Sequence, residues 1–486
     1  MTMTPFQITR SVRGLNRLRH IARVLTQHGF GHVVSQLNLS RYVPVWMMRR
    51  KAKVVDAASG SPSIGRRIAR ICSELGPTFV KLGQMLSTRP DLVPVDVLKE
   101  LRTLQDNVPP FDTQSAMQIL QSELGRPIRE CYSSVDEVPI ASGSIGQVYR
   151  ACTVNGGEVV IKIRRPDADD TIRSDIVVLK WLAESLEALV PESRMYRPKM
   201  LIAELEEMLT RELDYVHEAS ATTRFAAAFS NEVGLKIPAV FWDLSGKRIL
   251  TLGVLRGVNF AEIWGGDKRL VESIDRKLLA RRLANAYFKQ VFEIGLFHCD
   301  PHPGNLLVEP PATLGLLDFG QVTSVSNELM TELVAIVYAC VHREVSLVVD
   351  GLADLGALGE NTDRRGLERS LGVLIDKYHG LPLKLLELTT IIAEFSDVIR
   401  RHDVIIPRDA VLLCKGIGMV AGLCAKLDPD LDVLSLLRER LEKTTRSQFS
   451  TQAFARGAAI SGWHVYNILR RAPAQLRESL RRAGSG

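Results

Sequence analysis

The spacing of apolar and polar residues predicts strands in one part of the chain and helices in another. Residues 159–161 form a β-branched Val-Val-Ile run that ends in Lys162 and follows an Asn-Gly-Gly turn at 155–157, a pattern typical of a hairpin strand. Residues 327–440 instead repeat leucine and valine at helical spacing with few helix breakers. We therefore expect a lobe built on strands, followed by a larger helical lobe.

Two short acidic motifs match the parts of a phosphoryl-transfer site. Asp300 is followed five residues later by Asn305, the spacing at which kinase catalytic loops carry an aspartate that orients the acceptor hydroxyl and an asparagine that holds magnesium. Asp318, in Leu-Leu-Asp-Phe-Gly, would supply a second metal ligand. Magnesium prefers oxygen ligands from one or two carboxylates together with substrate phosphates. We therefore predict a magnesium site at Asn305 and Asp318 and a catalytic role for Asp300.

A glycine- and serine-rich segment upstream stands where a nucleotide-binding hairpin would begin. The four fixed positions of the pattern Gly-x-Gly-x-x-Gly-x-Val, of which only the first glycine is replaced, are held by Ala141, Gly143, Gly146 and Val148. Small residues there let backbone N–H groups approach phosphates closely. On its own this segment is more simply interpreted as a hairpin turn. The lysine that follows favours nucleotide binding, and Lys162 is our candidate for the α- and β-phosphates and for catalysis.

Such a lysine needs a carboxylate partner, and the segment Arg-Glu-Leu-Asp-Tyr-Val-His-Glu-Ala offers Glu212, Asp214 and Glu218. On one continuous helix Asp214 and Glu218 share a face, whereas Glu212 lies about 200° round from Asp214. We assign Glu218 to Lys162; the alternative is that these acids only solvate an amphipathic helix. The predicted nucleotide-binding residues come from the hairpin, from this ion pair and from the expected hinge between the two lobes, near residues 251–256. They are Ala141, Ser142, Gly143, Ser144, Gly146, Val148, Lys162, Glu218, Leu252 and Val254.

With these residues in place, the chain resembles the UbiB/ADCK family of atypical protein-kinase-like ATPases over roughly residues 65–440. Lys81-Leu-Gly-Gln84 matches the family's Lys-x-Gly-Gln motif, and Glu212-x-Asp214 matches its Glu-x-Asp motif. The phosphate loop looks like the family's Ala-rich loop. The resemblance implies an α+β, bilobal protein-kinase-like fold with a small antiparallel sheet lobe and a larger helical lobe. It also implies an N-terminal helical extension that packs over the active site and blocks peptide entry.

The same resemblance implies a function and a role for the extension. Family members bind ATP with magnesium and support isoprenoid quinone biosynthesis or lipid homeostasis through ATPase activity at the membrane. Lys81 and Gln84 are three residues apart, so on a helix they share one face. We expect both to point at the nucleotide cleft, where they contact phosphate or Glu212 and Asp214. Without the family pattern, Lys81 is more simply a solvated helix residue.

The segment after Asp-Phe-Gly is too short for the peptide-docking platform of protein kinases. Residues 321–326 lead directly into a predicted amphipathic helix, and Cys299 stands where protein kinases carry the arginine that reads a phosphorylated activation loop. His302 stands where they carry a lysine; it either steadies the γ-phosphate or only orders the loop. Two positions depart from the family pattern: Gly143 replaces an alanine of the loop, and Gly253 replaces an acidic residue that is common in the hinge.

Basic residues are concentrated at the two ends of the chain, which the net charge of +7 conceals. Residues 1–55 contain ten arginines and lysines and no acid, and their cationic and apolar residues alternate at helical spacing. We interpret this head as a membrane-surface helix. The alternatives are an organelle transit peptide or a face packed on the kinase-like body. The tail, residues 446–486, has a similar composition and would be a second anchor.

Composition excludes several other classes of protein. No segment has the roughly 18 uninterrupted apolar residues of a transmembrane helix, because Lys415 interrupts the best candidate at 410–427. We therefore expect a cytoplasmic protein that is peripheral at a membrane surface. The seven cysteines are scattered and lack Cys-x-x-Cys spacing, which indicates buried thiols in a reducing compartment. No DNA-binding, zinc or base-stacking pattern accompanies the basic charge, so we expect no nucleic-acid partner.

Three functions compete on this basis. The first is a UbiB-like ATPase, the second a kinase of a small molecule or lipid head group, and the third a nucleotide-binding scaffold without turnover. Expected partners are ATP, a membrane lipid or isoprenoid quinone precursor, and quinone-biosynthesis enzymes. The predicted domains are the basic head (1–55), the helical extension (56–125), the kinase-like N-lobe (126–255), the helical C-lobe (256–445) and the basic tail (446–486).

Overall fold

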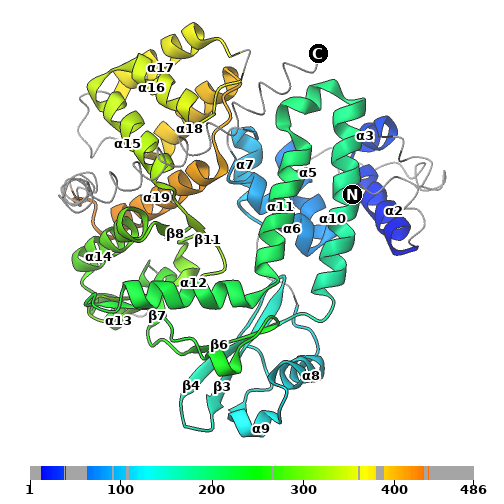
Figure 1. Ribbon diagram of the computed structural model, residues 1–486, viewed down its shortest axis with the longest axis vertical. Helices are drawn as coiled ribbons and strands as arrows, with labels where there is room; N and C mark the ends of the chain where they lie inside the picture. Colours follow the sequence, from blue (N-terminus) through cyan, green and yellow to red (C-terminus); the bar gives the residue numbers. More distant parts are fainter. Residues whose placement is uncertain are drawn as a thin grey trace, which may run out of the picture.

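The computed structural model has a β-sheet at one end and two groups of helices that extend from it (Figure 1). One group contains the N-terminal helices and the other contains the C-terminal ones. The structure describes residues 12–37, 63–89, 92–104, 109–264, 268–359, 362–378 and 388–431, with the single positions 39 and 436.

The small lobe is built on a five-stranded antiparallel sheet in which β2 lies beside β3 and the others follow the order β1-β3-β4-β6. The strands are β1 (Tyr132–Val135), β2 (Ala141–Ser142), β3 (Gly146–Thr153), β4 (Glu158–Arg164) and β6 (Ile249–Gly253). Val159 and Ile161 of β4 are buried against α8 (Thr113–Leu124), and α9 (Ile128–Cys131) follows α8. Because side chains alternate along a strand, Lys162 lies on the opposite face. The predicted hairpin strand is confirmed, and its alternation points Lys162 away from the α8 core.

Two long helices inserted after β4 pack on the N-terminal extension rather than on the sheet. Helices α10 (Ala168–Leu189) and α11 (Pro198–Glu212), joined by the 3-10 turn η2 (Pro191–Tyr196), stand beside the extension in Figure 1. They share one hydrophobic core with the N-terminal helices. These are α2 (Val12–Gln27), α3 (Gly31–Gln36), α5 (Ile64–Leu75), α6 (Pro77–Leu86) and α7 (Val95–Leu101). The insertion therefore fastens the extension to the small lobe.

The described part of the basic head is packed on the body of the protein. Leu18 and Ile21 of α2 are buried. Arg17 donates to both carboxylate oxygens of Asp175 on α10, at 2.5 and 2.8 Å, and to the carbonyl of Leu75 at 2.6 Å. An apolar stripe that is buried in protein cannot insert into lipid, so the membrane-helix interpretation is wrong for this face, and the packed-face alternative holds. The remainder of the head and the whole tail lie outside the described residues.

The large lobe packs around α14 (Arg276–Lys289) and α19 (Arg408–Leu427). Helix α12 (Tyr215–Ala228) packs against both lobes, and the turn η3 (Trp242–Leu244) belongs to the small lobe. The large lobe also contains the turn η4 (Phe260–Trp264), α13 (Lys268–Glu272) and the π-helical turn η5 (Gln290–Ile294). A mixed sheet of order β5-β10-β9-β7 joins β5 (Leu235–Lys236), β10 (Thr313–Leu316), β9 (Leu306–Glu309) and β7 (Val258–Asn259). A separate core holds α15 (Asn327–His342), α16 (Val345–Asp354), α17 (Arg364–Tyr378) and α18 (Leu388–Arg401). The helical prediction for 327–440 is confirmed where the structure describes it.

Helix α19 is the one described helix that is long and apolar enough to cross a membrane by length and composition. Of its most apolar stretch, 44% is buried inside the protein. It packs against α14, and its Lys415 forms an ion pair within the large lobe. In this structure α19 is therefore a core helix.

Candidate active site

Strand β4 and helix α12 bring the predicted lysine and glutamate together. Lys162 pairs with Val148 of β3 on one side and Leu250 of β6 on the other, so it stands in the middle of the sheet. Its ammonium group forms an ion pair with the Glu218 carboxylate of α12 and lies 3.5 Å from Oδ1 of Asp318. Three residues that are far apart in sequence thus meet at one point, as predicted.

The charges in this cluster affect one another strongly. Burial alone would lower the pKa of Lys162, but the carboxylates of Asp318 and Glu218 outweigh it and raise that pKa. The same lysine holds the pKa of Asp318 well below its usual range. Burial raises the pKa of Glu218, and the adjacent lysine opposes that shift. The cluster therefore has a charged lysine and an ionised, half-exposed Asp318, as a cation and phosphate site requires.

Asp318 is held in an uncommon backbone conformation. Its φ of 54° is left-handed, and its Oδ1 accepts a hydrogen bond from the N–H of Gly320 at 3.1 Å. The next side chain, Phe319, is buried and lies 4.8 Å from the ring of Phe225 on α12, measured between centroids. This packing anchors the residue next to Asp318 against α12, the helix that carries Glu218. The strained residue is thus the one predicted to bind metal, consistent with the tendency of strain to occur at functional sites.

The catalytic loop leaves β8 (Leu296–His298) and passes through the 3-10 turn η6 (Pro303–Asn305). His298 Nδ1 accepts from the N–H of Asp300 at 3.1 Å, and its Nε2 lies 3.3 Å from the carbonyl of Leu317, which assigns the Nε2–H tautomer. Burial lowers the pKa of His298, which keeps the ring neutral. A neutral histidine therefore connects the two acidic motifs. Its role was not predicted from the sequence, although it stands only two residues before Asp300.

The side-chain amide of Asn305 is held by a hydrogen bond within the catalytic loop. Its Nδ2 donates to the carbonyl of Asp300 at 3.3 Å, which leaves the amide oxygen to face elsewhere. Among the described residues, no group of three His, Cys, Asp or Glu side chains could hold a metal by itself. A site of one carboxylate and one amide fits magnesium, which keeps waters and takes phosphate oxygens as further ligands. The donor set of Asn305 and Asp318 is thus suited to a magnesium–nucleotide complex.

The other polar residues of the loop have structural contacts. The Nδ1 of His302 accepts from the N–H of Gly304 at 3.0 Å, so this ring caps η6 and orders the loop. Cys299 is buried, and burial raises the pKa of its thiol to about 12. A thiol that stays protonated at neutral pH is a poor nucleophile, and all seven cysteines are free. Asp300 and Asn305 therefore remain the candidates for the chemistry of the loop.

The turn between β2 and β3 is held closed by an arginine that the sequence analysis missed. Arg165 donates from Nε to the carbonyl of Gly143 and from its terminal nitrogen to Ser142 Oγ, both at 3.0 Å. Ser144 is buried. A Cβ on Gly146 would lie 2.6 Å from the carbonyl oxygen of Ile163, so this glycine is required by strand packing. Ala141, opposite Val148 in the hairpin, is exposed.

A second lysine–glutamate pair lies beside the first. Helix α6 begins at Pro77, and its N-cap Gly76 has a φ of 93°. The helix places the Nζ of Lys81 3.2 Å from Oε1 of Glu212. The same Glu212 oxygen accepts from Nε2 of Gln321, three residues after Asp318, at 3.2 Å. The side chains of Lys81 and Glu212 are only 8% and 10% exposed. The expected contact between Lys81 and Glu212 is therefore present, and it reaches the loop that carries Asp318.

Two predictions about this region are wrong. Gln84 does not share the target of Lys81, because its amide donates to the carbonyl of Leu104 at 3.3 Å. Asp214 does not share a helical face with Glu218, because α11 ends at Glu212 and α12 begins at Tyr215. Asp214 is instead the N-cap of α12 and accepts from the N–H of Val216 at 3.0 Å. The helical wheel failed here because it assumed one continuous helix.

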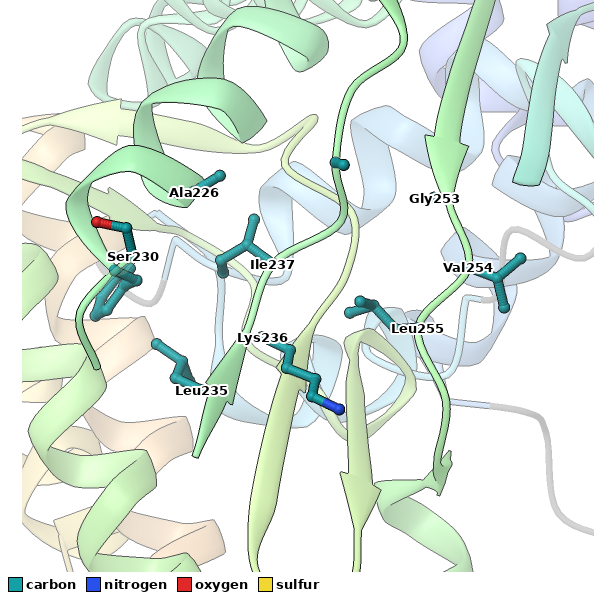
Figure 2. Close-up of a pocket in the computed structure, with 10 residues that line it drawn as sticks. Ala226, Ser230, Leu235, Lys236, Ile237, Gly253, Val254 and Leu255 are labelled. Carbon is teal, nitrogen blue, oxygen red and sulfur yellow. The ribbon is translucent and has the colours of Figure 1, made fainter. Parts of the chain in front are cut away.

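A cavity of about 420 Å³ lies beside the hinge, between the end of α12, residues 235–239 and residues 253–255. Figure 2 shows Val254 and Leu255 on one side and Ala226 and Ser230 on the other. A Cβ on Gly253 would make only ordinary contacts with Ala239. The N–H of Val254 donates to the carbonyl of Glu158 at 3.2 Å, so it is not the group available to an adenine. Leu252 is buried and forms a bridge with Val240.

Comparison with known proteins agrees with this geometry. The ABC1 atypical kinase-like domain matches residues 103–351, and the UbiB helical domain matches residues 371–432. The chain belongs to the UbiB family of atypical kinase-like proteins. Membership confirms the predicted α+β, bilobal kinase-like fold and the predicted resemblance.

Relatives in this family cover most of the chain. The probable protein kinase UbiB of Xanthomonas euvesicatoria pv. vesicatoria (strain 85-10) is 32% identical over 458 residues, which is 92% of this chain and 81% of the relative. An uncharacterized protein encoded in the hydrogenase 1 5′ region of Clostridium pasteurianum is 29% identical and covers 89% of this chain and 77% of its own length. Among solved structures, the Rv3197–erythromycin complex from Mycobacterium tuberculosis matches with a TM-score of 0.45 and 24% identity, covering 74% of this chain and 94% of that one.

Proposed function

We propose that this UbiB-family protein binds magnesium–ATP and transfers its terminal phosphoryl group to water at a membrane surface, in support of isoprenoid quinone biosynthesis or lipid homeostasis. The observation that carries the proposal is the meeting of Lys162, Glu218 and Asp318 beside the loop of Asp300 and Asn305. A charged lysine next to an ionised, half-exposed carboxylate offers a contact to phosphate and a ligand to a cation in one place.

Each residue then has a role that its chemistry allows. Lys162, held by Glu218, contacts the α- and β-phosphates. Asn305 and Asp318 hold magnesium, which when bound neutralises charge on the phosphates. Asp300 receives the proton of the acceptor. The turn at 141–146 covers the phosphates, and the strand at 252–254 borders the adenine.

Two features argue that the acceptor is small. After Asp318 the chain forms β11 (Val322–Ser324), which pairs with β8, and α15 begins at Asn327, so this stretch has no segment long enough for a peptide platform. The second feature is the Lys81–Glu212–Gln321 contact, which ties α6 to the loop that carries Asp318. Water fits these limits, and so does the head group of a lipid. The outer side of α2, where Arg19 and Arg23 are exposed, offers positive charge to an anionic membrane.

The test is an assay of the purified chain with γ-labelled ATP, magnesium and vesicles, with and without anionic lipid and an isoprenoid quinone precursor. Release of labelled phosphate that increases with anionic vesicles supports the proposal. Label that stays in the lipid phase would instead identify a lipid kinase, the alternative favoured by the short segment after Asp318. Binding of ATP without turnover would contradict the proposal in favour of a scaffold. The quinone role is tested separately by comparing quinones and their precursors in cells with and without the gene.

A further inference from the structure

A lysine from the C-terminal helical region contacts the aspartate of the catalytic loop. The Nζ of Lys415, on α19, donates to Oδ1 of Asp300 at 3.0 Å. The two residues are 115 positions apart, and each side chain is 28% exposed. Lys415 lies within the UbiB helical domain match at 371–432, outside the ABC1 kinase-like domain match at 103–351. The two regions of the family therefore meet at one carboxylate oxygen.

The packing of α19 brings this lysine close to the loop. Gly416, the next residue, lies against Tyr287 of α14, and a Cβ on it would collide with the Tyr287 hydroxyl and lie 2.8 Å from its ring carbon Cζ. The same hydroxyl donates to the carbonyl of His298 at 3.4 Å, at the start of the catalytic loop. Without a side chain at Gly416, α19 can approach the loop closely enough for Lys415 to reach Asp300.

The position of Lys415 is costly unless the charge has a use. It is a cation in the one described helix that is long and apolar enough to cross a membrane, where hydrophobic residues would pack with less loss of hydration. The catalytic loop itself lacks the lysine that protein kinases carry two residues after the aspartate. His302 stands there, and its Nδ1 accepts from the N–H of Gly304. Lys415 thus supplies from α19 a positive charge that this loop does not contain.

We infer that Lys415 is a positioning residue for Asp300, so that the UbiB helical domain completes the phosphoryl-transfer site of the kinase-like domain. By holding Oδ1, it leaves Oδ2 to accept the hydrogen bond of the acceptor hydroxyl. In the step it serves, the acceptor oxygen bonds to the terminal phosphorus of ATP. The bond from that phosphorus to the bridging oxygen breaks, its electron pair leaves with ADP, and the acceptor proton passes to Asp300. This inference rests on the proposed function.

The experiment compares K415M, K415R, D300N and the D300N/K415M double variant with the wild-type chain. We expect K415M to lower kcat for ATP hydrolysis by about 10- to 100-fold, the effect of a misplaced catalytic group. The affinity for magnesium–ADP should stay within about twofold, since Lys415 contacts Asp300 and not the predicted nucleotide site. K415R should recover most of the lost rate, and the double variant should be no slower than D300N alone, because the lysine acts through the aspartate.

K426M is the matched control. Lys426 is on the same helix, and its ammonium group lies 5.7 Å from the centre of the Trp264 ring, away from Asp300. An unchanged kcat in K415M, a rate loss equal to that of K426M, or a loss that adds to that of D300N would each overturn the inference. A wild-type chain that binds magnesium–ATP without turnover would instead contradict the proposed function. In that case urea denaturation of the same variants decides, because coupling between the two substitutions supports the pair and its absence overturns it.

Discussion

Two lysine–glutamate pairs lie next to each other in this protein, and they differ in their third member. In the first cluster, Lys162 contacts two carboxylates, those of Glu218 and Asp318. In the second cluster, the Glu212 carboxylate accepts from Lys81 and from the neutral amide of Gln321. Asp318 and Gln321 belong to the same short loop. We infer from this difference that the first cluster is fit to receive a cation and phosphate, whereas the second is a closed contact between the extension and the loop.

The largest expected effect comes from removing the Asp318 carboxylate from the first cluster. Asp318→Asn keeps the shape of the side chain but removes a carboxylate ligand of magnesium. We expect the affinity for magnesium–ATP to fall by about 100-fold or more, measured by calorimetry. The control is Asp136→Asn, at an exposed position of the small lobe, which should not change the affinity. Undiminished binding by D318N would contradict the metal assignment.

Lys81→Met tests the second cluster. It removes one partner of a buried ion pair, so the Glu212 carboxylate loses its contact with the Lys81 ammonium group. Such changes typically cost about 3 kcal/mol in the free energy of unfolding, measured here by urea denaturation. Lys180→Met is the matched control, because its pair with Glu206 is 48% and 42% exposed and should cost no more than about 1 kcal/mol. Equal losses of unfolding free energy in the two variants would mean that the Lys81–Glu212 ion pair does not hold the extension in place.

Gly416→Ala tests whether close packing of α19 is what delivers Lys415. The new Cβ would meet the Tyr287 hydroxyl, and overpacking of this kind costs about 1–3 kcal/mol of stability. Turnover should fall as well, because α19 must move away from the catalytic loop. Gly422→Ala on the same helix has open space around its Cβ and should be neutral or slightly stabilising. A G416A variant as stable and active as G422A would refute the packing argument.

The smallest effect should be a pH dependence due to His298. Burial lowers the pKa of this ring in the folded protein, so the unfolded chain binds a proton first as the pH falls. Its contribution to stability is therefore complete above about pH 6.5 and is lost below it, by at most about 1.4 kcal/mol per pH unit. His298→Gln should flatten the curve of stability against pH between 7 and 5, measured by urea denaturation. Curves of equal slope for wild type and H298Q would exclude His298 as the source.

The main residues of the candidate site could be predicted because most of them stand in short motifs with fixed spacings. Asp300 and Asn305 lie in one loop, Asp318 lies in a motif a few residues further on, and Lys162 directly follows a β-branched run within a strand. Such spacings survive folding because local backbone geometry determines which side chains share a face. The same reasoning failed at Asp214, where a helix that looked continuous is broken at residues 213–214.

The amino-acid sequence was sufficient to predict the kinase-like motifs and their order. The distant residues that contact them became visible only in the packing of the folded chain: Arg165 on the turn between β2 and β3, Gln321 on Glu212, and Lys415 on Asp300. The tertiary structure also decided that the apolar face of α2 is buried against the body, and that Gln84 holds a backbone carbonyl. A charged group or an amide forms its hydrogen bond with whichever partner the packing of the helices brings within about 3 Å. That packing depends on contacts between residues far apart in sequence, which no local spacing reveals.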